Sequence, residues 1–244
     1  MTDESLLKPN NRVIMVSGAS RGIGAAIAKQ LLSDGYRLSL GARTPSTVTR
    51  SLDEQEKSRA IVSRFEATDP ATTIQWIKDT VDFYGQIDGL INNAGILRQV
   101  DFETGEETDL DAMWEINVKA PFRLIKHCLP LLKKSKNGRI INIASTDGKR
   151  YRETVSVGYT MAKHALVGLS NAARFAGWND GVRVTALCPG AVNTNLVANI
   201  TGVTPTNQRL SPDVIAAMVS VLLTLPNTAS VSEMPINTRL ESSL

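Results

Sequence analysis

The chain has 244 residues, of which 42% are hydrophobic and 5% aromatic, and its formal net charge is +3. This composition supports a folded core and excludes the strongly basic or aromatic-rich surfaces that bind nucleic acid. No run of about 18 apolar residues marks a membrane span, and the N-terminal stretch "MTDESLLKPNNR" lacks the apolar segment of a secretory signal. We therefore expect a cytoplasmic protein with no membrane and no nucleic-acid partner.

Short runs rich in Val, Ile and Leu alternate with helical patterns along the chain. The first strand is predicted at 12–17, and a helix follows over 22–33 and ends at Asp34-Gly35. Further strands are predicted at 36–42, 60–65, 87–92, 138–145 and 182–189, and further helices at about 45–58, 70–84, 109–134, 156–177 and 211–224. This alternation predicts α/β architecture: one doubly wound domain over residues 1–244, with a parallel sheet and helices on both faces.

Cysteine and histidine are scarce and scattered. Cys128 and Cys188 are the only cysteines, and His127 and His164 are the only histidines. Their spacing fits no metal site, and two isolated cysteines favour a reducing compartment over a disulfide framework. His127 and Cys128 lie in an amphipathic segment, so we interpret both as packing residues and predict no metal.

The ends of the first two strands indicate a nucleotide site, because ligands bind at the carboxyl ends of such strands. The first ends in "GASRGIG" (18–24), whose glycines let the backbone approach a pyrophosphate at a helix N-terminus. Near the second, an NAD site would place an acid for the ribose, yet no acid occurs between Asp34 and Asp53. Arg43 stands there instead, and two guanidinium groups, Arg21 and Arg43, suit the 2′-phosphate of NADP. A purely structural glycine turn with two solvated arginines is the alternative.

The fourth and fifth strands end in residues suited to catalysis. "NNAG" (92–95) offers small residues against which a flat cofactor can lie. Ser145 ends the fifth strand, and Tyr159 and Lys163 lie four residues apart on one helix face. A nearby ammonium favours the phenolate, so these three residues form a candidate acid/base set. An ordinary helix surface is the alternative for the Tyr–Lys pair alone.

Taken in order, these residues resemble the short-chain dehydrogenase/reductase family over nearly the whole chain, from Arg12 to about Asn237. The matching motifs are GASRGIG, NNAG, Asn117 in "WEINVKAPF", Ser145 after "GRIINIAS", the Tyr159–Lys163 pair, and "CPGAVNT" at 188–194. The resemblance implies a Rossmann fold with a mostly parallel, seven-stranded sheet, its last strand at about 232–237. It also implies a homodimer or homotetramer formed through the helices at 109–134 and 156–177.

The resemblance also implies an activity: NADP(H)-dependent interconversion of a small-molecule carbonyl and an alcohol by hydride transfer at nicotinamide C4. Tyr159 would be the general acid or base, and Ser145 would bind the substrate oxygen. Lys163 would lower the pKa of Tyr159 and bind the nicotinamide ribose, and Asn117 would hold a water for a proton relay. The alternative is a catalytically silent nucleotide-binding regulatory protein, against which the intact catalytic set argues. A nucleic-acid or protein-interaction module on this fold is opposed by the lack of a basic stripe.

The residues expected to bind the cofactor follow the same motifs. They are Gly18, Ser20, Arg21, Gly22, Ile23, Gly24, Arg43, Thr44, Glu66, Ala67, Asn93, Ala94, Gly95, Tyr159, Lys163, Pro189, Gly190, Val192 and Thr194. Two features depart from the family. Glu66 stands where an Asp or Asn usually contacts adenine, with Asp69 as the alternative, and the tail "SVSEMPINTRLESSL" lacks glycine.

Two loops bear on the substrate. The segment 192–210, with Leu196, Ile200 and Val203, is predicted to be a lid over the substrate, a plain surface connection being the alternative. The loop after Ser145 carries Lys149, Arg150 and Arg152. We hypothesise that these cations favour an acidic substrate; a solvated basic loop is the alternative.

Overall fold

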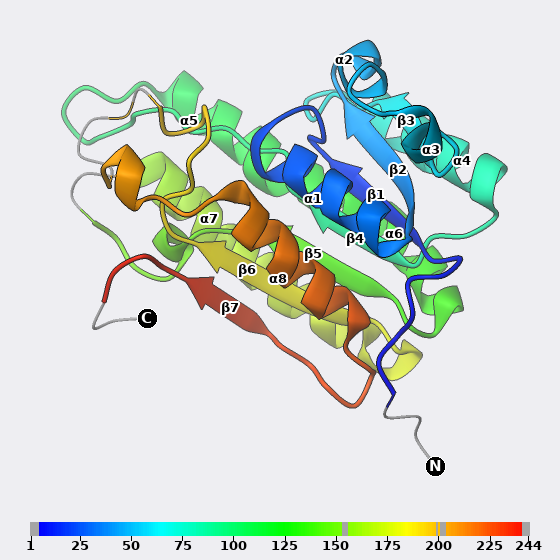
Figure 1. The fold of residues 1–244 in the computed structure, drawn as a ribbon. Coiled ribbons are helices and arrows are strands. Elements are labelled where there is room, and N and C mark those ends of the chain that lie inside the picture. Colours follow the sequence, from blue (N-terminus) through cyan, green and yellow to red (C-terminus); the bar gives the residue numbers. More distant parts are fainter. Residues whose placement is uncertain (1–4, 153–155, 199, 201–203, 241–244) are drawn as a thin grey trace.

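The computed structural model describes residues 5–152, 156–198, 200 and 204–240. Within them, seven parallel strands form one sheet in the order β3-β2-β1-β4-β5-β6-β7 (Figure 1). The strands are β1 (Val13–Ser17), β2 (Arg37–Ala42), β3 (Ala60–Arg64), β4 (Gly89–Asn92), β5 (Arg139–Ile143), β6 (Arg183–Pro189) and β7 (Glu233–Ile236). Every predicted strand is therefore confirmed, including the last one.

Helices cover both faces of the sheet, with α1 and α8 packed together on one face and α4, α6 and α7 on the other (Figure 1). The α-helices are α1 (Gly22–Asp34), α2 (Pro45–Thr49), α3 (Glu54–Lys57), α4 (Pro70–Tyr84), α5 (Glu107–Trp114), α6 (Ala120–Ser135), α7 (Val157–Gly177) and α8 (Pro212–Thr224). Shorter turns are the π-helical η1 (Glu115–Lys119) and the 3-10 turns η2 (Thr146–Gly148), η3 (Trp178–Asp180) and η4 (Thr206–Gln208). None of the described helices is both long and apolar enough to cross a membrane.

The core consists of two apolar layers separated by the sheet. In β1, Ile14 and Val16 belong to the layer under α1 and α8, whereas Met15 belongs to the layer under α4, α6 and α7. All three side chains are fully buried. Burial on both faces explains why the strand reads as a continuous apolar run rather than an alternating one.

Two local predictions were wrong. The helix predicted over 45–58 is two short helices, because the Asp53 side chain accepts from the Glu56 N–H and the Glu56 side chain accepts from the Asp53 N–H, which starts a new helix. The helix predicted over 109–134 is confirmed as the continuous series α5, η1 and α6. Cys128 is fully buried as expected, but His127 is exposed.

The strand order reverses between β1 and β4, since the chain runs from β1 outward to β3 and then returns to β4 on the other side. A crevice forms at the carboxyl ends of strands at such a reversal, and ligands bind there. The fold therefore brings the glycine turn after β1 next to the NNAG turn after β4.

Candidate active site

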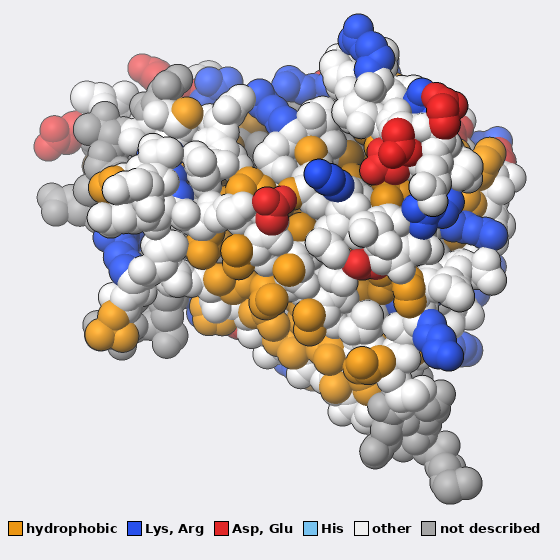
Figure 2. All heavy atoms as spheres, viewed as in Figure 1, with side chains coloured by type: hydrophobic (Ala, Val, Ile, Leu, Met, Phe, Trp, Pro, Cys, Tyr) orange, Lys and Arg blue, Asp and Glu red, His pale blue; other side chains and the backbone are white. Residues whose placement is uncertain are grey.

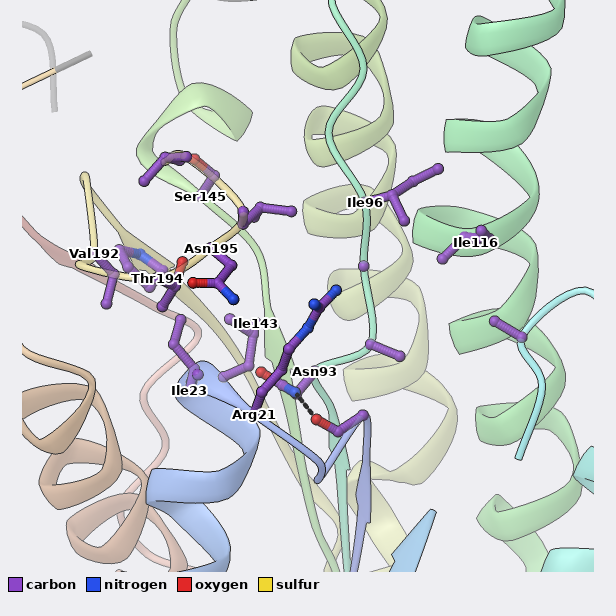
Figure 3. Close-up of a pocket in the computed structure, with 18 of the residues that line it drawn as sticks. Arg21, Ile23, Asn93, Ile96, Ile116, Ile143, Ser145, Val192, Thr194 and Asn195 are labelled. Atoms are coloured by element: carbon purple, nitrogen blue, oxygen red, sulfur yellow. Dashed lines mark hydrogen bonds between the residues drawn. The ribbon is translucent and has the colours of Figure 1, made fainter. Parts of the chain in front are cut away.

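A cavity of about 510 Å³ lies at this reversal point, walled by the turns after β1, β4, β5 and β6 and by α7 (Figure 3). Most of the sequence-predicted site residues line it: Gly18, Ser20, Arg21, Gly22, Ile23, Arg43, Glu66, Ala67, Asn93, Ala94, Gly95, Ser145, Tyr159, Lys163, Pro189, Gly190, Val192 and Thr194. Gly24, Thr44 and Asn117 lie outside its wall.

The glycine turn after β1 has the shape of a phosphate cradle. Gly18 and Gly22 have φ values of +69° and +56°, which favour glycine. A Cβ on Gly24 would lie 2.2 Å from the Gly18 carbonyl oxygen, so this position admits no side chain. The N-terminus of α1 has no side-chain cap and no acid in its first turn. Its first N–H groups therefore suit an anion such as the pyrophosphate of a dinucleotide.

The NNAG turn holds the glycine turn in place. The Asn93 Nδ2 donates to the carbonyl oxygens of Ser17 (3.0 Å) and Gly18 (3.1 Å), and Figure 3 shows Asn93 directed at that backbone. The Ser17 Oγ accepts from the N–H groups of Asn93 (3.0 Å) and Ala94 (3.1 Å). Asn93 thus fixes the cradle as well as lining the cavity.

On the β2–β3 side of the glycine turn, the strands finish in residues suited to the adenosine half of a dinucleotide. Arg21 and Arg43 both line the wall and are exposed. Beside them Glu66 and Ala67 follow β3. The Ala67 carbonyl accepts a 2.5 Å hydrogen bond from Nη2 of Arg123 on α6.

Arg123 also contacts η1, where its Nη1 donates to the Glu115 Oε1 at 2.7 Å. Burial of Glu115 works against its ionisation, but hydrogen bonds from Arg123 and Lys119 prevail and lower its pKa. Arg123 was not predicted from the sequence, because no motif surrounds it and its partner Ala67 is 56 residues away along the chain.

The three candidate catalytic side chains come together and are buried. Ser145, Tyr159 and Lys163 have exposed fractions of 6%, 6% and 5%. The Ser145 hydroxyl lies close enough to Tyr159 to lower the pKa of the phenol. The Lys163 Nζ lies 5.4 Å from the centre of the Tyr159 ring and donates to the Ile143 carbonyl at 2.8 Å. The bond to Ile143 thus links Lys163 of α7 to the end of β5.

Burial dominates the electrostatics of this set. It raises the pKa of Tyr159, the charge of Asp147 raises it further, and the Ser145 hydroxyl opposes both. Burial lowers the pKa of Lys163 to about 8, against the influence of Cys188 and Asp147. The net shift at Tyr159 is therefore opposite to the one expected from Lys163 alone.

Asn117 lies in η1, a π-helical turn of the kind that often marks functional positions. Its Oδ1 accepts from the Ile96 N–H and its Nδ2 donates to the Ile96 carbonyl, both at 2.9 Å. The amide thus anchors the loop after β4, while the proposed relay water stays a prediction.

The basic loop after Ser145 does not present its cations to the cavity. Lys149 forms an ion pair with Glu233 of β7, and Arg150 and Arg152 form ion pairs with Asp147. None of the three cations is among the described residues of the cavity wall. The acidic-substrate hypothesis thus finds no support in the cavity wall, and each cation of the loop is paired with a carboxylate, either Glu233 or Asp147.

The predicted lid is attached at both ends. Val192 and Leu210 form an isolated parallel bridge, and the Asn193 N–H donates to the Leu210 carbonyl at 2.8 Å. Residues 193–197 line the cavity, and Figure 3 shows Thr194 and Asn195 beside it. Residues 199 and 201–203, including Val203, lie outside the described part of the chain.

Several wall residues were missed by sequence reasoning. They are Ala42, Phe65, Ile96, Ile116, Ile143 and Ala144, whereas Asn193, Asn195, Leu196 and Val197 belong to the segment predicted as a lid. Adjacent motif residues were the available signal, since Ile143 and Ala144 directly precede Ser145.

A dinucleotide cradle at one end and a buried phenol with a lysine at the other are what an oxidoreductase acting on alcohols and carbonyls requires. The comparisons agree. The chain belongs to the short chain dehydrogenase family, whose model matches residues 12–203. This family membership supports redox exchange between a carbonyl and an alcohol with a nicotinamide cofactor as the activity to propose for the chain.

The relatives and solved structures show how far the likeness extends. The chain is 39% identical to an agropine synthesis reductase of Rhizobium rhizogenes over 94% of its own length but 53% of that protein. It thus spans about half the length of this relative. It is 33% identical to the uncharacterized oxidoreductase YxjF of Bacillus subtilis, over 77% of this chain and 74% of that one. An alcohol dehydrogenase from the archaeon Thermococcus sibiricus, complexed with 5-hydroxy-NADP, matches with a TM-score of 0.85 and 30% identity over 94% of this chain and 99% of that one.

Proposed function

We propose that this chain is an NADP(H)-dependent oxidoreductase that interconverts a small carbonyl compound and its alcohol within a single domain, with Tyr159 as the general acid and base. The observation that carries the proposal is the buried set of Ser145, Tyr159 and Lys163 on the wall of the cavity that also holds the glycine turn.

When bound, the cofactor supplies or accepts the hydride at its nicotinamide ring. Ser145 holds the substrate oxygen and stabilises its developing charge. In reduction the Tyr159 Oη gives its proton to that oxygen, and in oxidation it takes the proton back. Lys163 holds the nicotinamide ribose, and its ammonium form favours the phenolate. Asn117, next to the loop after β4, completes the relay through a water.

NADP is preferred to NAD because arginines stand where an acid would hold the ribose 2′-hydroxyl. Arg43 directly follows β2, and Arg21 follows the first glycine of the turn by three residues. A guanidinium matches a phosphate with parallel N–H donors. Support also comes from the Thermococcus sibiricus enzyme, which is complexed with an NADP derivative.

The other cofactor contacts follow the wall of the cavity. Glu66 accepts from the adenine amino group, and Ala67 lies beside the same ring. Pro189, Gly190, Val192 and Thr194 pass beside the nicotinamide and its phosphates; all six residues line the cavity.

A homodimer or homotetramer is supported by apolar side chains on the helix surfaces. Phe122 of α6 and Met161 and Phe175 of α7 are 51%, 48% and 80% exposed. On the opposite side of the sheet, Figure 2 shows a band of hydrophobic side chains over α8, where Val214 and Val221 are exposed. Such surfaces are typical of interfaces between subunits.

A reducing, cytoplasmic location is supported by Cys128 and Cys188, both of which are free thiols.

The test is Tyr159→Phe, assayed by NADPH consumption with a panel of ketones, aldehydes and 3-oxoacyl esters. We expect turnover by the wild type on part of this panel and a loss of at least about 100-fold in kcat in the variant. NADPH binding should change little, since the phenol is one contact among many. Tight NADPH binding without turnover on any carbonyl, unaltered by the substitution, would instead support the silent regulatory protein.

A further inference from the structure

Asp147 is a buried carboxylate beside the catalytic set that the proposed mechanism does not use. It lies in η2, two residues after Ser145, and is 8% exposed. Its backbone N–H donates to the Ser145 Oγ at 3.0 Å, and its Oδ2 lies 3.4 Å from the same Oγ. Ser145 therefore contacts Asp147 through both backbone and side chain.

The turn that carries Asp147 is fixed against α7. A Cβ added to Gly148 would lie 2.7 Å from the Lys163 carbonyl oxygen, so the backbone of η2 packs directly on the helix turn that holds Lys163. A carboxylate held in this way has little freedom to turn away from the catalytic set.

The charges around Asp147 come from its own loop and from the elements packed on it. Arg150 and Arg152 form ion pairs with it. Tyr159 and Lys163 of α7 lie within range of its charge, and the Cys188 thiol of β6 acts on Lys163. The Lys149–Glu233 pair lies further out and is internally neutral. The charge of Asp147 raises the pKa of both Tyr159 and Lys163.

We infer that Asp147 is a positioning residue that holds the Ser145 hydroxyl and places a fixed negative charge beside the catalytic set, which favours carbonyl reduction over alcohol oxidation. This inference rests on the proposed function. Reduction needs the phenol as a proton donor, whereas oxidation needs the phenolate as an acceptor. A neighbouring negative charge opposes formation of the phenolate. The Arg150 guanidinium, which is paired with Asp147, reduces the negative charge that acts on Tyr159.

Two substitutions with opposite expected effects test the inference. Asp147→Asn keeps the shape of the side chain but removes its charge, so the pKa of Tyr159 falls. The midpoints of the pH–rate profiles for reduction and for oxidation should both move down by about one pH unit. Arg150→Met leaves Asp147 less compensated, so the same midpoints move up. Lys149→Met is the matched control, since Lys149 lies in the same loop but is paired with Glu233. Its pH–rate midpoints should equal those of the wild type.

A second readout needs no substrate. The chain has four tyrosines, so ultraviolet titration of each protein is compared with the same protein carrying Tyr159→Phe, and the difference isolates the Tyr159 phenol. Asp147→Asn should ionise at lower pH than the wild type. A merely structural role for Asp147 would not move this midpoint.

The inference is overturned if Asp147→Asn leaves the Tyr159 midpoint where the wild type has it, or if Arg150→Met and Asp147→Asn move it in the same direction. If Arg150→Met does not fold, the Tyr159 midpoints of Asp147→Asn and Lys149→Met are compared instead, and only that of Asp147→Asn should differ from the wild type. Absence of turnover in the wild type would remove the proposed function but leave the titration result standing, so the two failures are distinguishable.

Discussion

Arg123 connects the adenine end of the cavity to the helix that carries Asn117, although it lies outside the cavity wall. Its Nη2 holds the Ala67 carbonyl at 2.5 Å, and its Nη1 holds Glu115, the first residue of η1, at 2.7 Å. We predict that Arg123→Met weakens binding of the adenine half of the cofactor and leaves the nicotinamide half unaffected.

The size of the effect follows from burial. The Arg123 and Glu115 side chains are 18% and 27% exposed, so this pair is stronger than an ordinary surface ion pair. A charge-assisted hydrogen bond contributes about 1.5–3 kcal/mol. The loop also keeps the hydrogen bonds between Thr72 and the Glu66 backbone, at 3.0 and 3.1 Å, and therefore does not collapse. We expect a loss of about 1–2 kcal/mol in NADPH binding, which is roughly 5- to 30-fold in Kd.

The assay compares two ligands. NADPH contains the adenosine half, whereas reduced nicotinamide mononucleotide lacks it. Arg123→Met should raise the Kd of NADPH and leave that of the mononucleotide unchanged. Lys119→Met is the matched control, because Lys119 also pairs with Glu115, at 3.0 Å, but its side chain is 57% exposed. An equal rise in the Kd of both ligands, or an unchanged Kd of NADPH, would show that Arg123 does not act on the adenine half of the cofactor.

Three further predictions follow. Gly24→Ala should weaken NADPH and NADH alike by about 10-fold or more, because its Cβ would meet the Gly18 carbonyl; calorimetry tests this against Gly168→Ala, whose Cβ would meet nothing within 4 Å. Lys163→Met should melt higher than the wild type at pH 7. The folded pKa of about 8 lies below the ordinary lysine pKa of 10.5, so the burial penalty is fully present below pH 8 and fades as pH rises to 10.5. A melting difference that does not change with pH would contradict this. Phe175→Glu should lower the sedimentation coefficient towards that of a monomer, and an unchanged coefficient would exclude α7 from the subunit contact.

The strands and the cavity residues were predictable because each is encoded locally. Apolar runs give buried strands, and the residues at strand ends, such as Ser145, necessarily meet at one edge of a parallel sheet. The predicted strand bounds differ from those observed by no more than two residues at either end.

The remaining features depend on contacts between distant residues. The charge of Lys149 is neutralised by Glu233, 84 residues away, so the loop sequence alone reads as basic. Arg123 reaches Ala67 across 56 residues. The π-helical turn at Asn117 arises within a continuous helical pattern, which hydrophobic periodicity does not distinguish from a regular α-helix.

A binding titration with NADPH and NADH tests the proposal that the site is built for NADP(H). Each arginine contact to the 2′-phosphate contributes about 1.5–3 kcal/mol, or roughly 10- to 100-fold in Kd. We predict that the wild type binds NADPH at least about 10-fold more tightly than NADH, and that Arg43→Ala or Arg21→Ala removes most of that preference while leaving NADH binding intact. Equal or tighter binding of NADH by the wild type would show that the site is not built for NADP(H).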